Sequence, residues 1–134
     1  MQAEEITLRP AAPPDEEFAW QVHNATIKPM VTQVWGWDEA WQRNAHMDHF
    51  RQSPPQIIVC DGQDAGVWAT HSEPSYIHVD TLLILPAWQR RGVGSYLLRS
   101  ELSAAAAQGK AVRLQVFRIN LPARAFYAHL GFQQ

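Results

Sequence analysis

One stretch, residues 82–98, constrains this chain more than any other. A short apolar run from Leu82 to Leu85 ends at Pro86, and a polar turn with two arginines and two glycines follows. A helical pattern then begins at about Val93. The stretch predicts a strand, a loop and the start of a helix in direct succession.

The loop in this stretch has the chemistry of an anion site. The first N–H groups of a helix have no intrahelical acceptor, and the helix dipole adds partial positive charge there. Gly92 and Gly94 carry no side chain that would block a ligand, Arg90 and Arg91 add positive charge, and Ser95 adds a hydroxyl. We therefore expect this loop to bind an anion such as a phosphate.

Two familiar phosphate loops do not fit the sequence. The stretch has no Gly-Lys-Ser/Thr, and a Gly-x-Gly-x-x-Gly pattern would need a glycine where Leu97 stands. The run Gln89-Arg90-Arg91-Gly92-Val93-Gly94 instead resembles the Gln/Arg-x-x-Gly-x-Gly/Ala signature of the GNAT superfamily, the acyl-CoA-dependent N-acetyltransferases. In that family the loop binds the pyrophosphate of coenzyme A, so the resemblance implies acetyl-CoA as co-substrate.

A second block supports the resemblance. A strand-like run, Leu114 to Ile119, leads to Asn120, the pair Phe126-Tyr127 follows, and Gly131-Phe132 closes the block. GNAT proteins typically have a strand, an Asn, an aromatic-Tyr pair seven residues later and a final Gly-Phe. The two blocks occur in the family's order and together span about 50 residues, which makes the combination far more specific than either motif alone.

Composition sets broad limits on the function. A chain of 134 residues with 46% hydrophobic and 18% charged residues fits one soluble globular domain. The net charge of −2 gives no general attraction to nucleic acid or to an anionic membrane. The single Cys60 excludes an intrachain disulfide, and no signal peptide or membrane-length apolar run is visible, so we expect a cytoplasmic protein.

The remaining elements follow from periodicity and from turn residues. We expect strands at about 6–10, 56–60, 65–71, 76–85 and 112–117, and helices at about 15–28, 38–51, 93–108 and 120–130, with a loop from Pro29 to Trp37. Along the strand at 76–85, strict alternation predicts Ile77, Val79 and Leu83 on one face and Asp80 and Leu82 on the other.

These elements, with the resemblance, predict an α/β (α+β) fold. It has a mixed, mostly antiparallel sheet with helices on both faces, splayed after the central strand to admit the cofactor. GNAT proteins normally continue into a C-terminal β-hairpin, whereas only Phe132 to Gln134 remain here. We therefore expect residues 1–134 to be a single GNAT-like domain truncated at its C-terminal end, or one whose bare strand edge is covered by a second copy in a homodimer.

The resemblance also implies site residues. Cofactor contacts would come from the central strand, the loop, the helix start and the Asn, namely Leu82, Leu83, Ile84, Gln89, Arg90, Arg91, Gly92, Val93, Gly94, Ser95 and Asn120. Tyr127 would protonate the departing thiolate, since a phenol can donate a proton to a thiolate of comparable basicity. The structural alternatives are that Asn120 only caps a helix and that Tyr127 is a half-buried core residue.

Other polar and aromatic residues supply the rest of the candidate site. The family often has a carboxylate base on the central strand, and we rank Asp80 first and His78 second, with His71 at the end of the preceding strand. His46 and His49 share a helix face without a third ligand, so we expect no metal. For the acceptor we expect Met30, Trp35 and Trp37, with Trp41 nearby, to line a pocket suited to an apolar or aromatic amine; helix packing is the alternative role of the tryptophans.

The sequence therefore predicts an N-acetyltransferase (EC 2.3.1.-). It would move an acetyl group from acetyl-CoA to a primary amine of a small molecule or peptide by direct attack. Two other classes stay open: a non-catalytic acyl-CoA-binding module, and an assembly protein that uses the exposed strand edge.

Overall fold

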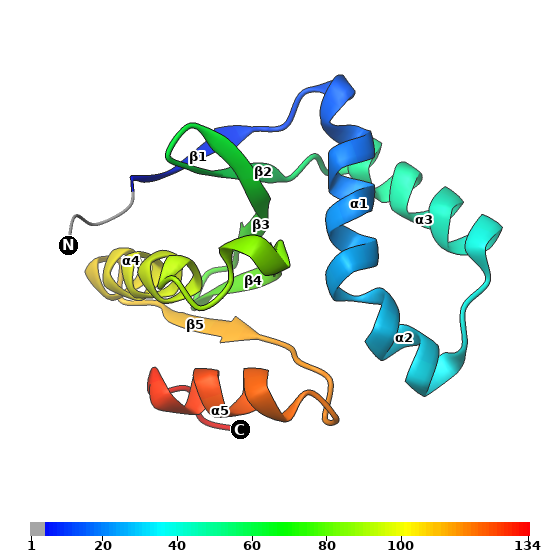
Figure 1. Ribbon diagram of the computed structural model, residues 1–134. Helices are drawn as coiled ribbons and strands as arrows, with labels where there is room; N and C mark the ends of the chain where they lie inside the picture. Colours follow the sequence, from blue (N-terminus) through cyan, green and yellow to red (C-terminus); the bar gives the residue numbers. More distant parts are fainter. Residues whose placement is uncertain (1–4) are drawn as a thin grey trace.

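A computed structural model describes residues 5–134. Its sheet has the strand order β1-β2-β3-β4-β5, so every strand lies beside its neighbour in sequence (Figure 1). The first three pairings are antiparallel and the β4–β5 pairing is parallel. The strands are β1 (Ile6–Pro10), β2 (Gln56–Cys60), β3 (Gln63–Ser72), β4 (Tyr76–Ile84) and β5 (Ala111–Leu114). The predicted mixed, mostly antiparallel sheet is confirmed.

Helices cover both faces of this sheet. The five α-helices are α1 (Glu16–Thr26), α2 (Lys28–Trp35), α3 (Glu39–Gln52), α4 (Val93–Ala107) and α5 (Leu121–His129), and short 3₁₀ turns lie at Pro13–Asp15 and Pro86–Trp88. One core cluster joins α1 and α3 to the sheet through Ala19, Val22, Phe50, Ile57 and Val67. The other cluster joins α4 to the opposite face through Ile58, Cys60, Ala65, Trp68, Val79, Val93, Leu97 and Leu98, with α5 packed against it.

The segment after Pro29, which the sequence predicts as a loop, forms helix α2. Pro29 lies in the first turn, where its missing N–H costs little, so it begins this helix as well as ending the previous one. Gly36 ends α2 with φ +81°, a conformation that favours glycine. The predicted loop from Pro29 to Trp37 is wrong, because a proline ends a helix that precedes it but is compatible with the first turn of the next one.

A β-bulge at Asp80 breaks the predicted alternation of β4. Ala69 of β3 pairs with Thr81 and Thr70 pairs with Val79, which leaves Asp80 as the extra residue. The predicted face pattern is therefore wrong beyond this point: Val79 packs into the same core cluster as Leu82, on the α4 side. Asp80 is thus the one residue of this part of β4 that has no pairing partner on β3.

Beyond the bulge, β4 and β5 part. The parallel pairing runs only from Tyr76–Ala111 to Val79–Leu114, and the strand predicted to reach residue 117 ends at Leu114. The edge of β4 from residue 80 to 84 that would face β5 consequently has no strand partner within the described chain. Residues 130–134 add no strand, and none of the described helices is long and apolar enough to cross a membrane.

Candidate active site

The predicted anion loop connects β4 to α4. Gly92 is the N-cap of α4 with φ +83°, and a Cβ there would meet nothing within 4 Å, so open space borders the start of the helix. The side-chain amide of Gln89 donates to the carbonyl oxygen of Ile84 at 2.8 Å and fixes the loop to the end of β4. The Arg91 guanidinium lies over the Trp88 ring, 4.9 Å from its centroid. Arg90 and Arg91 are both exposed, so cations flank the exposed N-terminus of α4.

Two residues in the first turn of α4 have roles that the sequence does not reveal. A Cβ on Gly94 would lie 3.5 Å from side-chain atoms of Ile84 and Phe126, so Gly94 faces the protein interior rather than a ligand. The Ser95 hydroxyl accepts a hydrogen bond from Nε of Arg99 at 3.0 Å. Arg99 thus adds a third cation near the loop, and its spacing of four residues from Ser95 is a signal that could have identified it.

A small cavity of about 300 Å³ lies where β4 loses its strand partner. Its walls hold several predicted cofactor contacts, the predicted acid and one predicted acceptor contact, in that order Leu82, Leu83, Ile84, Gln89 and Asn120, then Tyr127, then Met30. An exposed strand edge can pair with the amides of an extended ligand as it would with another strand. The edge, the cavity and the adjoining cationic loop together fit an acyl-CoA, which has two amides in its arm and phosphates at its far end.

The two residues of the second motif both reach this cavity. Asn120 caps α5, since its side-chain oxygen accepts from the N–H of Ala123 at 3.2 Å, and the residue also lines the small cavity. The Tyr127 ring contacts Phe126 and Phe132, with centroids 5.4 and 6.0 Å away. Burial raises the pKa of the Tyr127 phenol, so the phenol keeps its proton at neutral pH.

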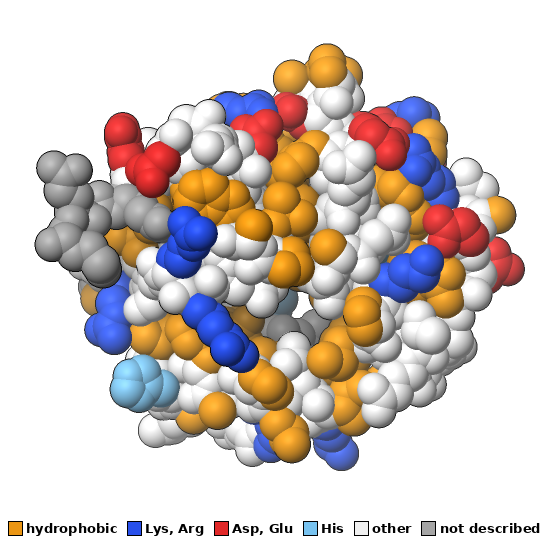
Figure 2. All heavy atoms as spheres, in the orientation of Figure 1, with side chains coloured by type: hydrophobic (Ala, Val, Ile, Leu, Met, Phe, Trp, Pro, Cys, Tyr) orange, Lys and Arg blue, Asp and Glu red, His pale blue; other side chains and the backbone are white. Residues whose placement is uncertain are grey.

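A second, open cavity of about 1080 Å³ adjoins the first. Figure 2 shows the molecular face hollowed near its middle, between the side formed by α1 and α2 and the side formed by α4 and α5. Six residues line both cavities: Ile27, Leu82, Leu83, Phe117, Asn120 and Tyr127. The large cavity also has Asp80 in its wall, so the predicted acid Tyr127 and the predicted base Asp80 face one connected space.

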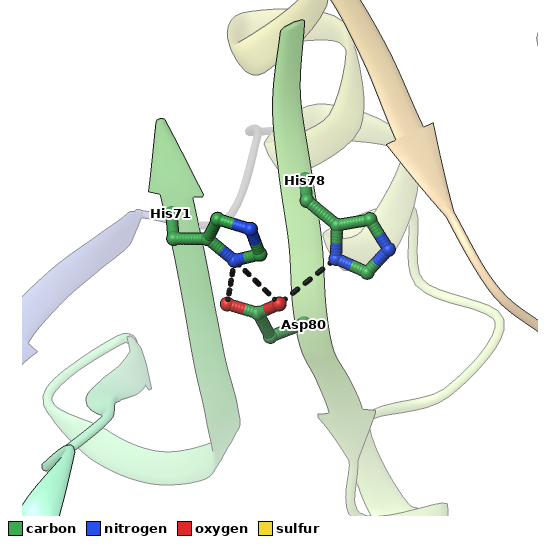
Figure 3. A group of neighbouring side chains, drawn as sticks. All are labelled: His71, His78 and Asp80. Atoms are coloured by element: carbon green, nitrogen blue, oxygen red, sulfur yellow. Dashed lines mark hydrogen bonds and ion pairs between the residues drawn. The ribbon is translucent and has the colours of Figure 1, made fainter. Parts of the chain in front are cut away.

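Asp80 is held between two histidines from adjacent strands (Figure 3). Nδ1 of His71 lies 2.8 Å from both carboxylate oxygens, and Nδ1 of His78 lies 2.8 Å from Oδ1. An ionised carboxylate only accepts hydrogen bonds, which assigns the proton of each ring to Nδ1. The two rings stack with centroids 5.2 Å apart, because the strand register pairs His71 with His78.

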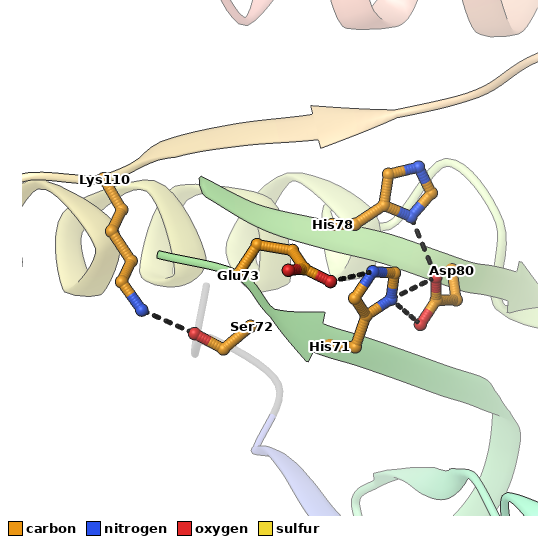
Figure 4. A network of polar contacts seen from close by, with 6 residues as sticks. All are labelled: His71, Ser72, Glu73, His78, Asp80 and Lys110. Carbon is orange, nitrogen blue, oxygen red and sulfur yellow. Dashed lines mark hydrogen bonds and ion pairs between the residues drawn. The ribbon is translucent and has the colours of Figure 1, made fainter. Parts of the chain in front are cut away.

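The polar network continues outward from this cluster (Figure 4). Nε2 of His71 lies 3.6 Å from a carboxylate oxygen of Glu73, and the hydrogen bond that His71 donates to Asp80 raises the pKa of the His71 imidazole. Lys110 donates to the Ser72 hydroxyl at 2.6 Å and ties the end of β3 to the start of β5. Ligand-type atoms of His71, His78 and Asp80 lie within 4.8 Å of one another, and the absence of a metal stays a prediction.

The predicted acceptor residues do not lie together. Trp35 lines the large cavity, whereas Met30 lines the small one. Trp37 is among the lining residues of neither; it packs against Trp20 and His23, with the Lys28 ammonium 5.1 Å from its ring centroid. Trp41 lines the large cavity although Trp37 does not. The end of α2 at Gly36 places Trp35 on one helix and Trp41 on the next, with Trp37 between them.

Histidines that the sequence leaves without a role also reach the large cavity. His23 of α1 and His46 of α3 line it, with ring centroids 5.1 Å apart. Nε2 of His23 and Nδ1 of His46 are buried and have no hydrogen-bond partner within residues 5–134. Burial lowers the pKa of His23 to about 4, and burial also lowers the pKa of His46. Both rings are therefore neutral at pH 7.

Known proteins share this architecture. Ard1 from Thermoplasma volcanium aligns with 23% identity and a TM-score of 0.66 over 96% of this chain and 82% of its own. The PaiA N-acetyltransferase from Thermoplasma acidophilum, solved in complex with coenzyme A, aligns with 18% identity and a TM-score of 0.72 over 96% of this chain and 90% of its own. An acetyltransferase from Thermus thermophilus aligns with 19% identity and a TM-score of 0.72 over 99% of this chain and 90% of its own. At these identities the likeness shows the fold.

Sequence comparison is decisive for the family. No curated protein sequence matches the chain significantly. The family profile described as the acetyltransferase (GNAT) domain matches residues 53–134, which is more than half of the chain and contains both motif blocks. The chain belongs to the GNAT acetyltransferase family and is an acyltransferase of class EC 2.3.1.-.

Proposed function

We propose that this protein transfers an acetyl group from acetyl-CoA to a primary amine by direct attack. One observation carries the proposal: Tyr127, Asn120 and the free edge of β4 border both the small cavity beside the anion loop and the large cavity that Asp80 lines. A thioester held in the small cavity would meet an amine arriving through the large one. The coenzyme A bound to the PaiA acetyltransferase of the same fold supports this choice of co-substrate.

Acetyl-CoA would be held mainly by backbone groups and cations. The free edge of β4 at Leu82 to Ile84 pairs with the amides of the pantetheine arm. The N-terminus of α4 at Gly92, with Arg90 and Arg91 beside it, holds the pyrophosphate. The amide of Asn120 remains available to the arm, because its capping bond uses only its oxygen.

The chemical step needs a neutral amine and a protonated leaving group. Asp80 accepts the first proton from the ammonium group, and the amine nitrogen then attacks the thioester carbonyl carbon. The C–N bond forms and the C–S bond breaks, and Tyr127 donates its phenolic proton to the departing thiolate. The second proton lost from the nitrogen passes to solvent, from which Tyr127 is reprotonated.

His71 and His78 are positioning residues in this scheme. Their Nδ1–H groups orient the Asp80 carboxylate, and neither residue lines a cavity. They hold the carboxylate in a fixed orientation in the wall of the large cavity.

A coupled assay tests the proposal. Calorimetric titration with acetyl-CoA gives the affinity, and free-thiol detection with a panel of primary amines gives the turnover. We expect Tyr127→Phe to lower turnover at least tenfold while acetyl-CoA affinity stays within twofold of the wild type. Tight acetyl-CoA binding without thiol release from any amine would favour the binding-module alternative, and unchanged turnover in Tyr127→Phe would remove that residue as the acid.

A further inference from the structure

We infer that the preferred acceptor is a small primary amine with one positive charge on an aromatic body. The inference rests on the proposed function and names the substrate class of the same site. It follows from two independent features of the large cavity, its charge and its aromatic mouth.

The charge of the cavity wall fits one ammonium group. Of the Asp, Glu, Lys and Arg side chains in residues 5–134, only Asp80 and Arg118 line the large cavity. A carboxylate with no second acid nearby in the wall can neutralise one cation, since opposite charges attract strongly only at short range. A second ammonium on the same substrate would find no acidic partner there and would meet Arg118. Polyamines and other polycationic amines are thus disfavoured.

Two of the three histidines in the wall, His23 and His46, add no charge, because burial lowers the pKa of each ring and both are neutral at pH 7. Their flat, uncharged rings pack against Trp20: His23 is stacked on it at a centroid distance of 5.6 Å, and His46 is tilted against it at 5.3 Å. This part of the wall suits an uncharged, flat group.

The mouth of the cavity is aromatic. Trp35 of α2 and Trp41 of α3 both line the cavity, yet 74% and 65% of their surfaces are exposed. Trp35 meets Phe117, which also lines the cavity, edge to face with centroids 5.6 Å apart. Three large aromatic rings from separate segments thus line the same open cavity as Asp80, a combination that suits an aromatic ring carrying an ammonium group.

A matched amine panel tests this inference. The kcat/KM of acetyl transfer is compared for 2-phenylethylamine, n-butylamine, spermidine and a short peptide with a free N-terminal Phe. We expect 2-phenylethylamine to exceed the other three by about tenfold or more, which corresponds to about 1.4 kcal/mol of extra stabilisation in the transition state.

Variants at the mouth provide the second arm. Trp35→Ala and Trp41→Ala should each reduce the preference for 2-phenylethylamine over n-butylamine about threefold or more, mainly through a higher KM. Tyr96→Ala is the matched control, because Tyr96 is an exposed aromatic residue on α4 that lines neither cavity. Calorimetric binding of 2-phenylethylamine to the protein saturated with coenzyme A reports the same contacts without turnover.

The outcomes separate this inference from the proposed function. If spermidine, n-butylamine or the peptide is acetylated as efficiently as 2-phenylethylamine, the inference is wrong and the proposed function stands. If no amine releases thiol although acetyl-CoA binds, the proposed function itself fails. An aromatic preference that survives both tryptophan substitutions would also overturn the inference.

Discussion

His71 and Asp80 form a bidentate contact across two strands, in which Nδ1 of the imidazole lies 2.8 Å from both carboxylate oxygens. The contact exists because the strand register pairs His71 with His78, and Asp80 follows His78 by two residues on the same strand. This hydrogen bond is the largest cause of the raised pKa of His71. Protonation of His71 is therefore linked to the stability of the fold.

We predict that the stabilising effect of His71 depends on pH. Because its folded pKa is raised above the unfolded value of 6.5, the stabilisation is fully present below pH 6.5 and is lost as pH rises past the folded pKa. Asn at this position can keep a donor near Nδ1 but does not titrate. The difference in Tm between the wild type and His71→Asn should be larger at pH 6 than at pH 9. Gln63→Asn, an exposed substitution on β3 that changes no ionisable group, should show a difference that does not vary with pH.

We predict that Asp80→Asn removes the proposed base while the protein stays folded. The amide has the same shape but cannot take the ammonium proton, so kcat/KM for the amine should fall by about 10²–10⁴-fold, the usual contribution of general acid–base catalysis. Acetyl-CoA affinity should stay within twofold. Asp64→Asn is the control, because Asp64 pairs with Arg9 at 3.1 Å and lines neither cavity. Equal losses in both variants would exclude Asp80 as the base.

We predict that Gly92→Glu abolishes cofactor binding. The substitution adds bulk and negative charge where the phosphates would lie, and we expect acetyl-CoA affinity to fall more than tenfold in calorimetric titration. Gly109→Glu is a close control at the other end of α4: Gly109 also has positive φ, +69°, and open space around it. Because both variants impose similar backbone strain and the same charge, weakened binding in Gly109→Glu as well would argue against a phosphate site at Gly92.

The strand, loop and helix around Gly92 could be predicted because their signals are local. Proline and glycine act on the backbone, and arginine on the charge, within a few residues. The structure of residues 82–98 therefore follows from the residue types within that segment. The same holds for the turn at Asp61-Gly62, where both residues have positive φ between antiparallel strands.

The polar cluster could not be predicted in full, because it depends on the pairing of separate strands. A bulge is set by the register between β3 and β4, and single-strand alternation contains no information about it. The same limit applies to His46, which meets His23 from another helix. The sequence identified Asp80, His78 and His71 as candidates, but only the register brings their side chains within hydrogen-bonding distance.

We predict that Gly66 is essential for the close approach of β3 to β4. A Cβ on Gly66 would lie 2.2 Å from the carbonyl oxygen of Leu83, and backbone cannot move aside as a flexible side chain can. Gly66→Ala should therefore destabilise the fold by about 1–3 kcal/mol, the usual cost of overpacking. Gly94→Ala is the matched comparison, since its Cβ would meet only side-chain atoms at 3.5 Å. In thermal unfolding, the Tm of Gly66→Ala should lie well below that of Gly94→Ala. Equal Tm values for the two variants would contradict the clash.

The buried pair His23 and His46 predicts acid sensitivity. The folded pKa of His23, about 4, lies below the unfolded value of 6.5, so the unfolded chain binds more protons throughout this window. Stability should thus be unaffected above pH 7 and should fall progressively as pH drops from 6.5 toward 4, and His46 contributes in the same direction. His23→Phe keeps an aromatic ring beside Trp20 and abolishes one buried nitrogen that lacks a partner. Its Tm should decline less steeply than that of the wild type between pH 6.5 and 4.

The ring of His23 also lines the large cavity. A flatter slope of Tm against pH in His23→Phe, with intact acetyl-CoA binding, would therefore locate this acid sensitivity in the wall formed by α1 and α3 rather than in the proposed cofactor site. A slope equal to that of the wild type would contradict the prediction.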